Sequence, residues 1–417
     1  MALLYTFNLY YTITIQTCLS QPWVHEYFKR QQDPNIDKYV IFVFTDTILL
    51  DKDQGYRGGI GDRLAGLISA FVYSQKVNRK FIIEASSDMM SIFQPYQYSN
   101  STNMLQYHSF SSSLSAAAAT SASSYSSGSV RDIRCMFHER LKNSECSLNR
   151  DYDQKVIRLH SNMATLCAAS VPSKCDTMPV PPSTLFDRNK LDTNAGCILR
   201  LALWPKPDLW TALFDRFDVK SPFDMMFGAH FRCGDHSFNS SKAGGPCVKV
   251  LWKRWSGNAP KGLRSKESPI DIGRCLRSSL DSSEALQPLV YVASDNVQSA
   301  AQIKSRIRPT VSVLTSPDTC HIDHQLPGGP SCEVNNLVDW FFLTLSTKLV
   351  TQVIRSKGEV GSAKPLSGFP LSAALYSLNK GALVDGYKCK PLAYDIFLES
   401  FGTWECVDEV CAATRIG

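Results

Sequence analysis

The segment between residues 38 and 84 constrains the fold most, because it joins a glycine-rich loop to three regular elements. Residues 38–45 form a short β-branched and aromatic run that is typical of a buried strand. A glycine-rich loop at 54–61 follows, and residues 62–77 then carry apolar side chains at helical spacing. Residues 80–84 restore the strand pattern. This order of strand, loop, helix and strand predicts a βαβ unit within a parallel sheet.

The second half of the chain repeats this α/β rhythm. Strands are expected at 224–231, 289–293, 311–314 and 349–354, and helices at 270–280, 296–307 and 337–345. Two parallel-sheet domains in succession would leave a cleft between them. In sheets of this class, ligands bind beyond the carboxyl ends of the strands.

The length of 417 residues also favours two domains, because single cores stop growing at roughly 250 to 300 residues. We assign residues 1–37 to an N-terminal segment, 38–215 to a first α/β domain and 216–417 to a second. Residues 109–130 are almost entirely Ser and Ala. Such a composition cannot bury enough apolar surface to offset its ordering entropy, so we predict a mobile insertion in the first domain.

The net charge of +6 is spread along the chain rather than gathered into a stripe. A nucleic-acid-binding surface requires dense Lys and Arg on one face, so we expect no nucleic-acid partner. A mild cationic excess suits a small anionic ligand such as a phosphate. It is explained equally well by a solubilising surface.

Fourteen cysteines indicate the redox environment. They lack the closely spaced pairs of a zinc site, and an even count without that spacing favours disulfides in an oxidising compartment. Glycosylation sequons at Asn100 and Asn239 agree with a lumenal or extracellular location. We therefore expect the protein in the secretory pathway.

The N-terminus leaves membrane attachment open. Residues 2–15 are apolar and aromatic but lack the basic n-region of a signal peptide, and Asn8 interrupts them. No stretch reaches the roughly 20 apolar residues that span a bilayer. Either this segment is a poor signal sequence or a membrane anchor lies outside this chain.

The first motif that carries chemistry is Gly58–Leu64 (GGIGDRL), between a predicted strand and a predicted helix. Glycines allow backbone amides to approach a ligand closely, and the N-terminus of the helix attracts phosphate. The motif lacks the Gly-Lys-Ser/Thr ending of a P-loop and the last glycine of a dinucleotide fingerprint. A tight structural turn with Asp62 as the helix N-cap explains the pattern equally well.

The second motif is His230–Asp235 (HFRCGD), at the carboxyl end of a predicted strand. Arg232 could hold a diphosphate through its planar donor fork. Asp235 could accept a proton or hold His230. The alternative is a strand-end salt bridge beside a histidine with satisfied hydrogen bonds.

Two further motifs follow in the second domain. Asp295 ends an apolar strand (YVASD), where it could pair with guanine or ribose hydroxyls, or cap the helix that begins at Asn296. The segment around Asp339 (DWFFL) precedes a Ser367-Gly368 step at a helix start, which is another arrangement that binds anions. The four motifs thus occur in a fixed order at strand ends.

These motifs resemble, in order and approximate spacing, those of the inverting fucosyltransferases of the α-1,6 and protein O-fucosyltransferase group. The resemblance extends from about residue 38 to residue 378, without the Ser/Ala insertion. It implies an α/β fold of two Rossmann-like domains facing across a cleft, called GT-B. It also implies GDP-fucose as donor substrate, a glycan or glycoprotein acceptor, a Golgi or ER location, and no metal cofactor.

The resemblance also implies roles for individual residues. The donor-binding set comprises Gly59, Gly61, Arg63, His230, Arg232, Asp295, Ser367 and Gly368, with Arg232 on the β-phosphate, His230 and Asp295 on guanine, and Ser367 on the diphosphate. The catalytic set comprises Arg232, Asp235 as the base, and Asp62. The family's protein O-fucosyltransferases have Asn where this chain has Asp62, and Cys233 interrupts the paired basic residues of the α-1,6 branch. The Asp51-Lys52-Asp53 sequence is interpreted as solvated turn residues rather than as a metal site.

Two other functions remain as alternatives. A non-catalytic secreted glycan-binding protein could keep the same fold without turnover. A nicotinamide-dependent oxidoreductase could use the glycine loop, and it requires an acidic residue at the end of the next strand, where Glu84 stands. The transferase hypothesis requires that Arg232 and the glycine turn near residue 60 face each other across a gap wide enough for a nucleotide diphosphate.

Overall fold

A computed structural model describes most of the regular elements of the chain. The described residues are 14–44, 59–96, 107–109, 130–135, 152–161, 191–217, 223–233, 268–316, 332–355, 363–365, 367–379, 381–392, 404–407 and 410–413. They divide into two compact units. The N-terminal unit comprises the described residues up to Leu209 together with strands β16 (Trp404–Val407) and β17 (Val410–Ala413), and the C-terminal unit comprises those from Trp210 to residue 392. The division falls inside helix α8 (Pro207–Phe217), the helix that also contains the division expected between 215 and 216.

The N-terminal unit contains a five-stranded sheet in the order β4-β2-β1-β6-β5, and every pairing in it is parallel. Its strands are β1 (Tyr39–Val43), β2 (Lys80–Ala85), β4 (Tyr107–Ser109), β5 (Val130–Cys135) and β6 (Val156–Ser161). Helix α3 (Ile60–Lys76) connects β1 to β2. The predicted βαβ unit is therefore confirmed.

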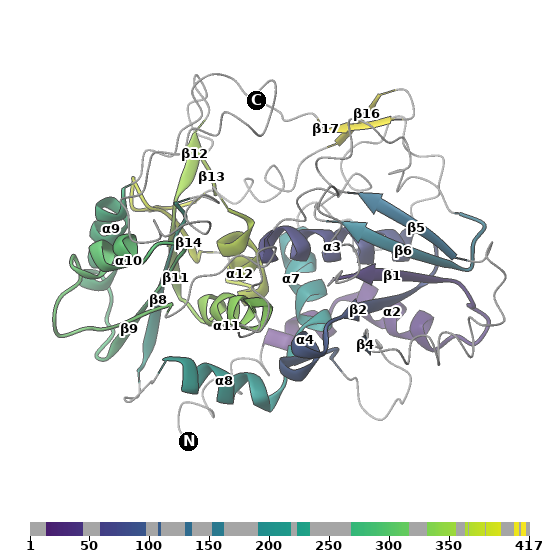
Figure 1. Cartoon of the computed structure of the whole chain (residues 1–417), viewed down its shortest axis with the longest axis horizontal. Coiled ribbons are helices and arrows are strands. Elements are labelled where there is room, and N and C mark those ends of the chain that lie inside the picture. The colour runs from purple at the N-terminus through teal and green to yellow at the C-terminus, as the bar shows by residue number, and fades with distance from the viewer. Residues whose placement is uncertain are drawn as a thin grey trace. The chain divides into compact units, whose positions relative to one another are not determined.

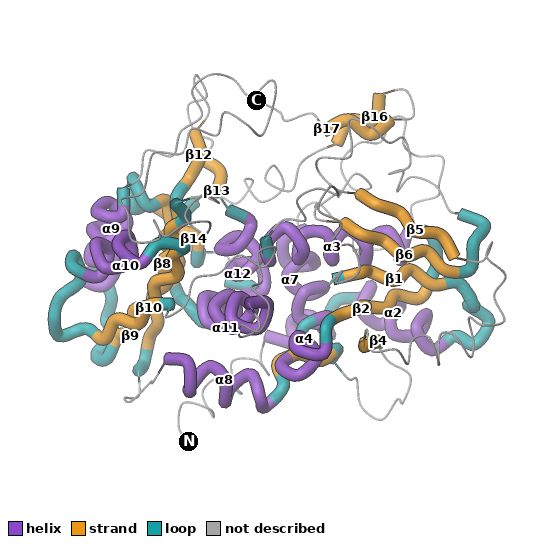
Figure 2. The backbone as a smooth tube through the Cα atoms, in the orientation of Figure 1, coloured by secondary structure: helices purple, strands orange, loops and turns teal. Residues whose placement is uncertain are grey.

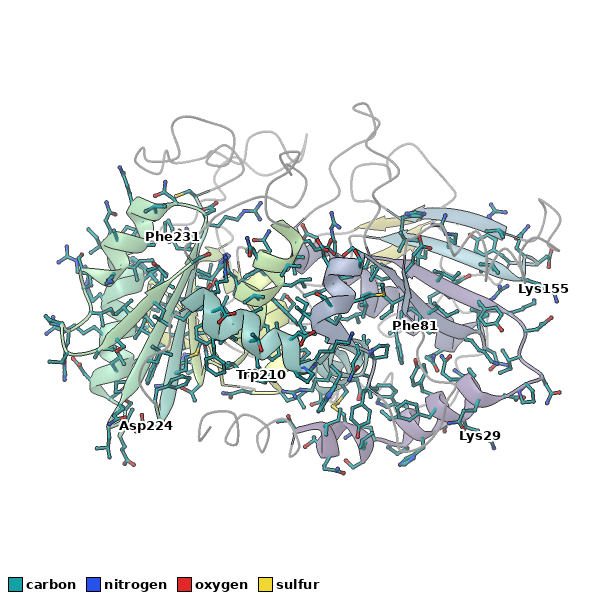
Figure 3. The ribbon with its side chains drawn as sticks, turned by 60° about the horizontal axis from the view of Figure 1, so that its bottom comes forward. Lys29, Phe81, Lys155, Trp210, Asp224 and Phe231 are labelled. Carbon is teal, nitrogen blue, oxygen red and sulfur yellow. A yellow bond between two sulfur atoms is a disulfide. The ribbon has the colours of Figure 1, made fainter. Side chains whose placement is uncertain are left out.

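Helix α3 lies at the centre of this unit and is buried along almost its whole length. It packs against β1, β6 and helix α7 (Leu191–Ala202), as Figure 1 shows. Helix α2 (Pro22–Gln32) adds aromatic side chains to the same core, because the Trp23 and Tyr27 rings lie 5.7 and 4.7 Å from that of Phe71. Phe71 in turn contacts Phe81 of β2, labelled in Figure 3.

A disulfide joins the chain before α2 to helix α7. It links Cys18 to Cys197 across 179 residues of sequence. Beside it, Trp23 Nε1 donates a buried hydrogen bond to Asn194 Oδ1 at 2.9 Å. The remaining elements of the unit are α4 (Ser87–Ile92) and an antiparallel pair of short strands, β3 (Phe93–Gln94) and β7 (Trp204–Pro205).

The C-terminal unit contains a six-stranded sheet in the order β10-β9-β8-β11-β14-β15. The first five strands are parallel and β15 is antiparallel to β14. The strands are β8 (Met225–Phe231), β9 (Pro288–Ser294), β10 (Ser312–Thr315), β11 (Lys348–Thr351), β14 (Leu383–Asp385) and β15 (Lys390–Pro391). The chain adds β9 and then β10 on one side of β8, and it then adds β11 and β14 on the other side. This is the order of a doubly wound fold, with its switch point between β8 and β11.

Helices cover both faces of this sheet (Figures 1 and 2). Helices α9 (Pro269–Asp281) and α10 (Val297–Lys304) pack on one face, and α11 (Cys332–Thr344) and α12 (Gly368–Ser377) pack on the other. Alternate residues of β8 serve the two faces, as a two-residue period requires. Phe227 belongs to the core beneath α9, whereas Gly228 lies against Leu343 of α11.

The predicted α/β class, with two successive parallel sheets, is confirmed. The predicted strand at 349–354 is interrupted at Gln352, so that β11 ends there and β12 (Val353–Arg355) pairs antiparallel with β13 (Ala363–Pro365). Helix α10 ends at Lys304, earlier than the predicted 307, because the hydrogen bonds after it form turns. Residues 110–129 of the predicted Ser/Ala insertion and both sequons lie outside the described residues, whereas the two ends of the insertion, Ser109 and Val130, belong to β4 and β5. Within the described part of the chain, no helix is long and apolar enough to cross a membrane.

Candidate functional site

The switch point between β8 and β11 is the place where a doubly wound sheet offers a ligand-binding crevice. Asp224 and Phe231, labelled in Figure 3, mark the two ends of β8. Asp224 accepts hydrogen bonds from the backbone of Leu286 and Gln287 at the amino end. The second sequence motif begins at His230, inside β8, and continues beyond Phe231, so it lies at the carboxyl edge, as expected.

Two side chains from other strands hold the turn that follows β8. Gln352, which follows β11, accepts the Arg232 backbone N–H at 2.7 Å through Oε1. Asp295, which follows β9, accepts the Cys233 backbone N–H at 2.6 Å through Oδ1. The second and third motifs are thus joined directly. The hydrogen bonds fix the backbone from which the Arg232 side chain extends.

His230 lies one residue inside this edge and is buried. It stands opposite Thr351 of β11 and its ring lies 5.4 Å from the ring of Phe369, with 30° between the planes. Burial, followed by the positive charge of Arg232, lowers the pKa of His230 to about 3. The imidazole is therefore neutral at physiological pH, where one ring nitrogen donates and the other accepts.

The fourth motif reaches the same edge through helix α12. Ser367 is its N-cap and is buried, and Ser367 Oγ accepts the Phe369 N–H at 3.2 Å. Gly368 is the first residue of the helix. Because Phe369 stacks on His230, the N-terminal turn of α12 and its partial positive charge lie beside the end of β8.

The alternative in which Asp295 caps helix α10 is wrong. Asn296 is the N-cap, and its Oδ1 accepts the Ser299 N–H at 2.8 Å. Asp295 instead bonds to the turn after β8. Its carboxylate is half-buried at the carboxyl edge, where a ligand would lie.

The glycine motif of the N-terminal unit opens helix α3. Gly59 is the N-cap and Asp62 occupies the third helical position, where its Oδ2 accepts the Gly59 N–H at 3.2 Å. Asp62 therefore stabilises the helix start, although not as the N-cap that we considered. Arg63 is buried and donates from Nη1 to the Phe44 carbonyl oxygen at 3.0 Å, which ties α3 to the end of β1. Gly61 is buried inside the first turn. The donor-binding roles of Gly59, Gly61 and Arg63 stay predictions.

Asp339, in the segment before the fourth motif, is a buried carboxylate that holds helices together. Arg216 of α8 donates to it from Nε at 2.9 Å, and the Ser316 hydroxyl donates to it as well. The pKa of Asp339 is raised, because burial raises it more than these hydrogen bonds lower it. We assign this network to the core of the unit rather than to the ligand edge.

Glu84 has a structural partner that weakens the oxidoreductase alternative. Its buried carboxylate receives two hydrogen bonds from Arg158, at 2.6 and 3.2 Å. A nicotinamide-dependent enzyme would need this carboxylate for the ribose hydroxyls. In this chain it instead links β2 to β6 across β1.

The sequence interpretation assigned no role to Gln352, or to Phe369 within the fourth motif. Gln352 was placed inside a predicted strand, although a polar residue after a buried apolar run is a signal of a strand end. The predicted base Asp235 and the Asp51 and Asp53 pair lie outside the described residues. Among the residues that the structure describes, no cluster of three or more His, Cys, Asp or Glu is placed to hold a metal ion.

Comparisons with known proteins give structural similarity at low sequence identity. Neither protein-family models nor curated proteins match the sequence. A mutant of Arabidopsis thaliana FUT1 in complex with GDP is 13% identical, with a TM-score of 0.44 over 92% of this chain and 79% of that one. The α-1,6-fucosyltransferase NodZ soaked with GDP-fucose is 14% identical, with a TM-score of 0.40 over 84% of this chain and 94% of that one. Fucosyltransferase NodZ from Bradyrhizobium gives 13% identity and a TM-score of 0.39 over 84% and 95% of the two chains.

Proposed function

We propose that this chain is an inverting glycosyltransferase that transfers fucose from GDP-fucose to a hydroxyl of a glycan or glycoprotein. The observation that carries the proposal is the meeting of three separate sequence motifs at one edge of the C-terminal sheet. Arg232, Asp295 and the Ser367 helix start come from distant parts of the sequence. They converge on the switch point, where doubly wound sheets bind nucleotides.

The edge offers the groups that a nucleoside diphosphate requires. The Arg232 guanidinium and the N-terminal turn of α12 supply positive charge for the diphosphate. Asp295 supplies a carboxylate acceptor for the N–H groups of guanine. His230 supplies a neutral ring with one donor and one acceptor, because its pKa of about 3 keeps it uncharged. The choice of guanine and of fucose rests on the motif resemblance.

In the proposed reaction, the acceptor oxygen attacks the anomeric carbon of fucose from the face opposite to GDP, and the bond to the β-phosphate oxygen breaks. Negative charge gathers on the leaving GDP in the transition state. Arg232 stabilises that charge from a backbone that two hydrogen bonds hold in place. The acceptor proton passes to a carboxylate base, for which we propose Asp235. We expect turnover without added divalent metal, because the protein supplies the positive charge.

We also propose that the protein works in the lumen of the secretory pathway. The Cys18–Cys197 disulfide and a further disulfide at Cys233 support an oxidising compartment. The sequons in the sequence agree with this location. Expression with a lumenal reporter, followed by glycosidase treatment, would test whether the protein enters the lumen and whether its sequons are glycosylated.

Thermal unfolding with GDP, UDP, ADP and CMP tests the nucleotide site, and GDP-fucose with a glycan and glycopeptide array tests transfer by product mass. We expect a rise in Tm specific to GDP and an added mass of one deoxyhexose on one acceptor class. Saccharide binding without a response to GDP would instead identify a non-catalytic glycan-binding protein. Equal responses to all four nucleotides would contradict the guanine assignment.

A further inference from the structure

Two free cysteines lie near each other at the buried face of α9, in the C-terminal unit. Cys275 lies in α9 and Cys389 lies in the turn between β14 and β15. The Cys275 thiol and the Cys389 backbone N–H both donate to the carbonyl oxygen of Asp385, at 3.7 and 2.8 Å. The Cys389 side chain also contributes, after burial, to the raised pKa of the Cys275 thiol. This shared carbonyl brings two thiol side chains from distant sequence positions together.

The two thiols differ in how deeply they are buried. Cys275 is fully buried in the core formed by α9 and the central strands, and Cys389 is half-buried against the same core. Among the described cysteines, Cys18, Cys197 and Cys233 are disulfide-bonded. The unpaired thiols therefore belong to a chain that already carries disulfides.

We propose that Cys275 and Cys389 form a thiol–disulfide site whose oxidation clips α9 to the β14–β15 turn. The oxidant is a small disulfide such as oxidised glutathione, or a protein disulfide of the same chemistry. The two thiols lose two protons and two electrons to form one S–S bond. The oxidant gains both and is reduced to two thiols.

The order of the exchange follows from exposure. Cys389 reaches solvent, so its thiolate attacks the oxidant first, releases one thiol and forms a mixed disulfide. Cys275 then attacks the Cys389 sulfur, which releases the second thiol. Burial raises the pKa of the Cys275 thiol, so the second step is slow at neutral pH and accelerates as pH rises.

The clip would stabilise the unit at the end of β14, two strands away from β8, because Asp385 pairs with Thr351 of β11 and Thr351 pairs with His230. It would close a loop of roughly 110 residues, and loops of that size give a large stabilisation when cross-linked. We expect oxidation to raise Tm by about 5 °C. We expect no change in GDP affinity, because neither cysteine bonds to the turn after β8. The inference thus stands apart from the proposed function.

The test treats the folded full-length chain with oxidised or reduced glutathione at pH 7 and pH 8.5. Free thiols are then alkylated and the peptides are mapped by mass. We expect a Cys275–Cys389 cross-linked peptide in the oxidised sample, preceded by glutathione on Cys389 and formed faster at pH 8.5. Persistent glutathione on Cys389 without the cross-link, or no reaction of either thiol, would overturn the proposal.

Two variants separate the clip from other disulfides. Cys389→Ser and Cys275→Ala should each lose the cross-linked peptide and the part of the redox-dependent Tm shift that it causes. A residual shift common to both variants reports other disulfides, such as Cys18–Cys197 and the one at Cys233. Because Cys389 is half-buried, Cys389→Ser keeps the proposal testable if Cys275→Ala fails to fold. An unchanged redox shift in Cys389→Ser would also overturn the proposal.

Discussion

Gln352 accepts the backbone N–H of Arg232 at 2.7 Å, across the boundary between the two strands where the sheet reverses its order. Gln352 is buried, although its place in the sequence is the break between two short strands. Its side-chain oxygen takes the place of a backbone carbonyl and continues the hydrogen bonding between β8 and β11 beyond Thr351. We infer that it determines the direction in which the Arg232 side chain leaves the sheet.

Gln352→Ala should therefore weaken GDP binding more than it weakens the fold. The substitution leaves the Arg232 N–H without its acceptor, which costs about 1 to 2 kcal/mol of unfolding free energy. We expect about a tenfold weaker affinity for GDP by calorimetry, because the guanidinium is less well positioned. The matched control is Gln302→Ala, on the exposed surface of α10, which should change neither quantity. Unaltered GDP affinity in Gln352→Ala would contradict the positioning role.

Arg232→Ala should abolish donor binding and turnover while leaving Tm within about 2 °C, because the side chain is only half-buried. Arg232→Lys keeps the charge but loses the planar donor fork, so its activity should lie between those of Ala and wild type. Arg274→Ala removes an exposed guanidinium from α9 and serves as the control. Wild-type kinetics in Arg232→Ala would refute its role in the reaction.

His230 makes stability depend on pH. Its folded-state pKa of about 3 lies below the unfolded value of 6.5, so the unfolded chain binds the extra proton between these pH values. Stability is therefore full above pH 6.5 and falls by up to about 1.4 kcal/mol per pH unit as pH decreases below it. His230→Gln should flatten the urea-unfolding profile between pH 6.5 and 5, where few carboxylates titrate.

The control for that profile is His25→Gln, because His25 lies on the exposed surface of α2. It should retain the wild-type slope. The same reasoning predicts that His230 contributes no step to the pH dependence of activity between pH 5 and 8. A slope in His230→Gln equal to that of wild type would show that other groups cause it.

The sequence predicted the central elements because their signals are local. Apolar strands with β-branched residues and helices with one apolar face are visible in a window of a few residues, and β8, β9, α9 and α3 were all recognised this way. The strands β4, β5, β6 and β14 were missed. β4 and β14 have three residues each, and charged residues interrupt the apolar pattern of β5 and β6. The pairing of all four depends on partners far away in the sequence, which no local pattern records.

The site was predicted in part for the same reason. The residues at strand ends were found, because parallel strands bring their carboxyl ends to one edge. The contacts among them were not. The Gln352 bond to Arg232 and the stacking of Phe369 on His230 depend on strand order and on the packing of α12. The sequence left open whether Asp295 binds a ligand or caps the following helix, and only the register of β8 with β9 decides that it bonds to Cys233.

The ion pair of Arg216 and Asp339 should contribute far more to the free energy of unfolding than a surface ion pair does. Arg216→Met would leave a buried carboxylate without its cation, which costs about 3 to 5 kcal/mol at pH 7 by urea unfolding. Because the Asp339 pKa is already raised, its protonation at lower pH should reduce that deficit. Arg308→Met removes the exposed pair with Asp281 and should cost less than about 1 kcal/mol. Equal losses in the two variants would contradict the buried assignment.

Gly59 offers a test of whether the glycine loop approaches a ligand. Its φ of −73° and ψ of −179° suit any residue, and a Cβ there would meet no atom within 4 Å. Gly59→Ala should therefore change the unfolding free energy by less than about 0.5 kcal/mol. If a backbone amide of this loop contacts the donor, the added methyl group should still raise the KM for GDP-fucose. Gly386→Ala is the contrasting variant, because its Cβ would lie 2.9 Å from the Thr351 carbonyl oxygen and against Ile272, so that it should lower Tm. Wild-type KM together with wild-type stability in Gly59→Ala would assign this glycine to neither the fold nor the donor.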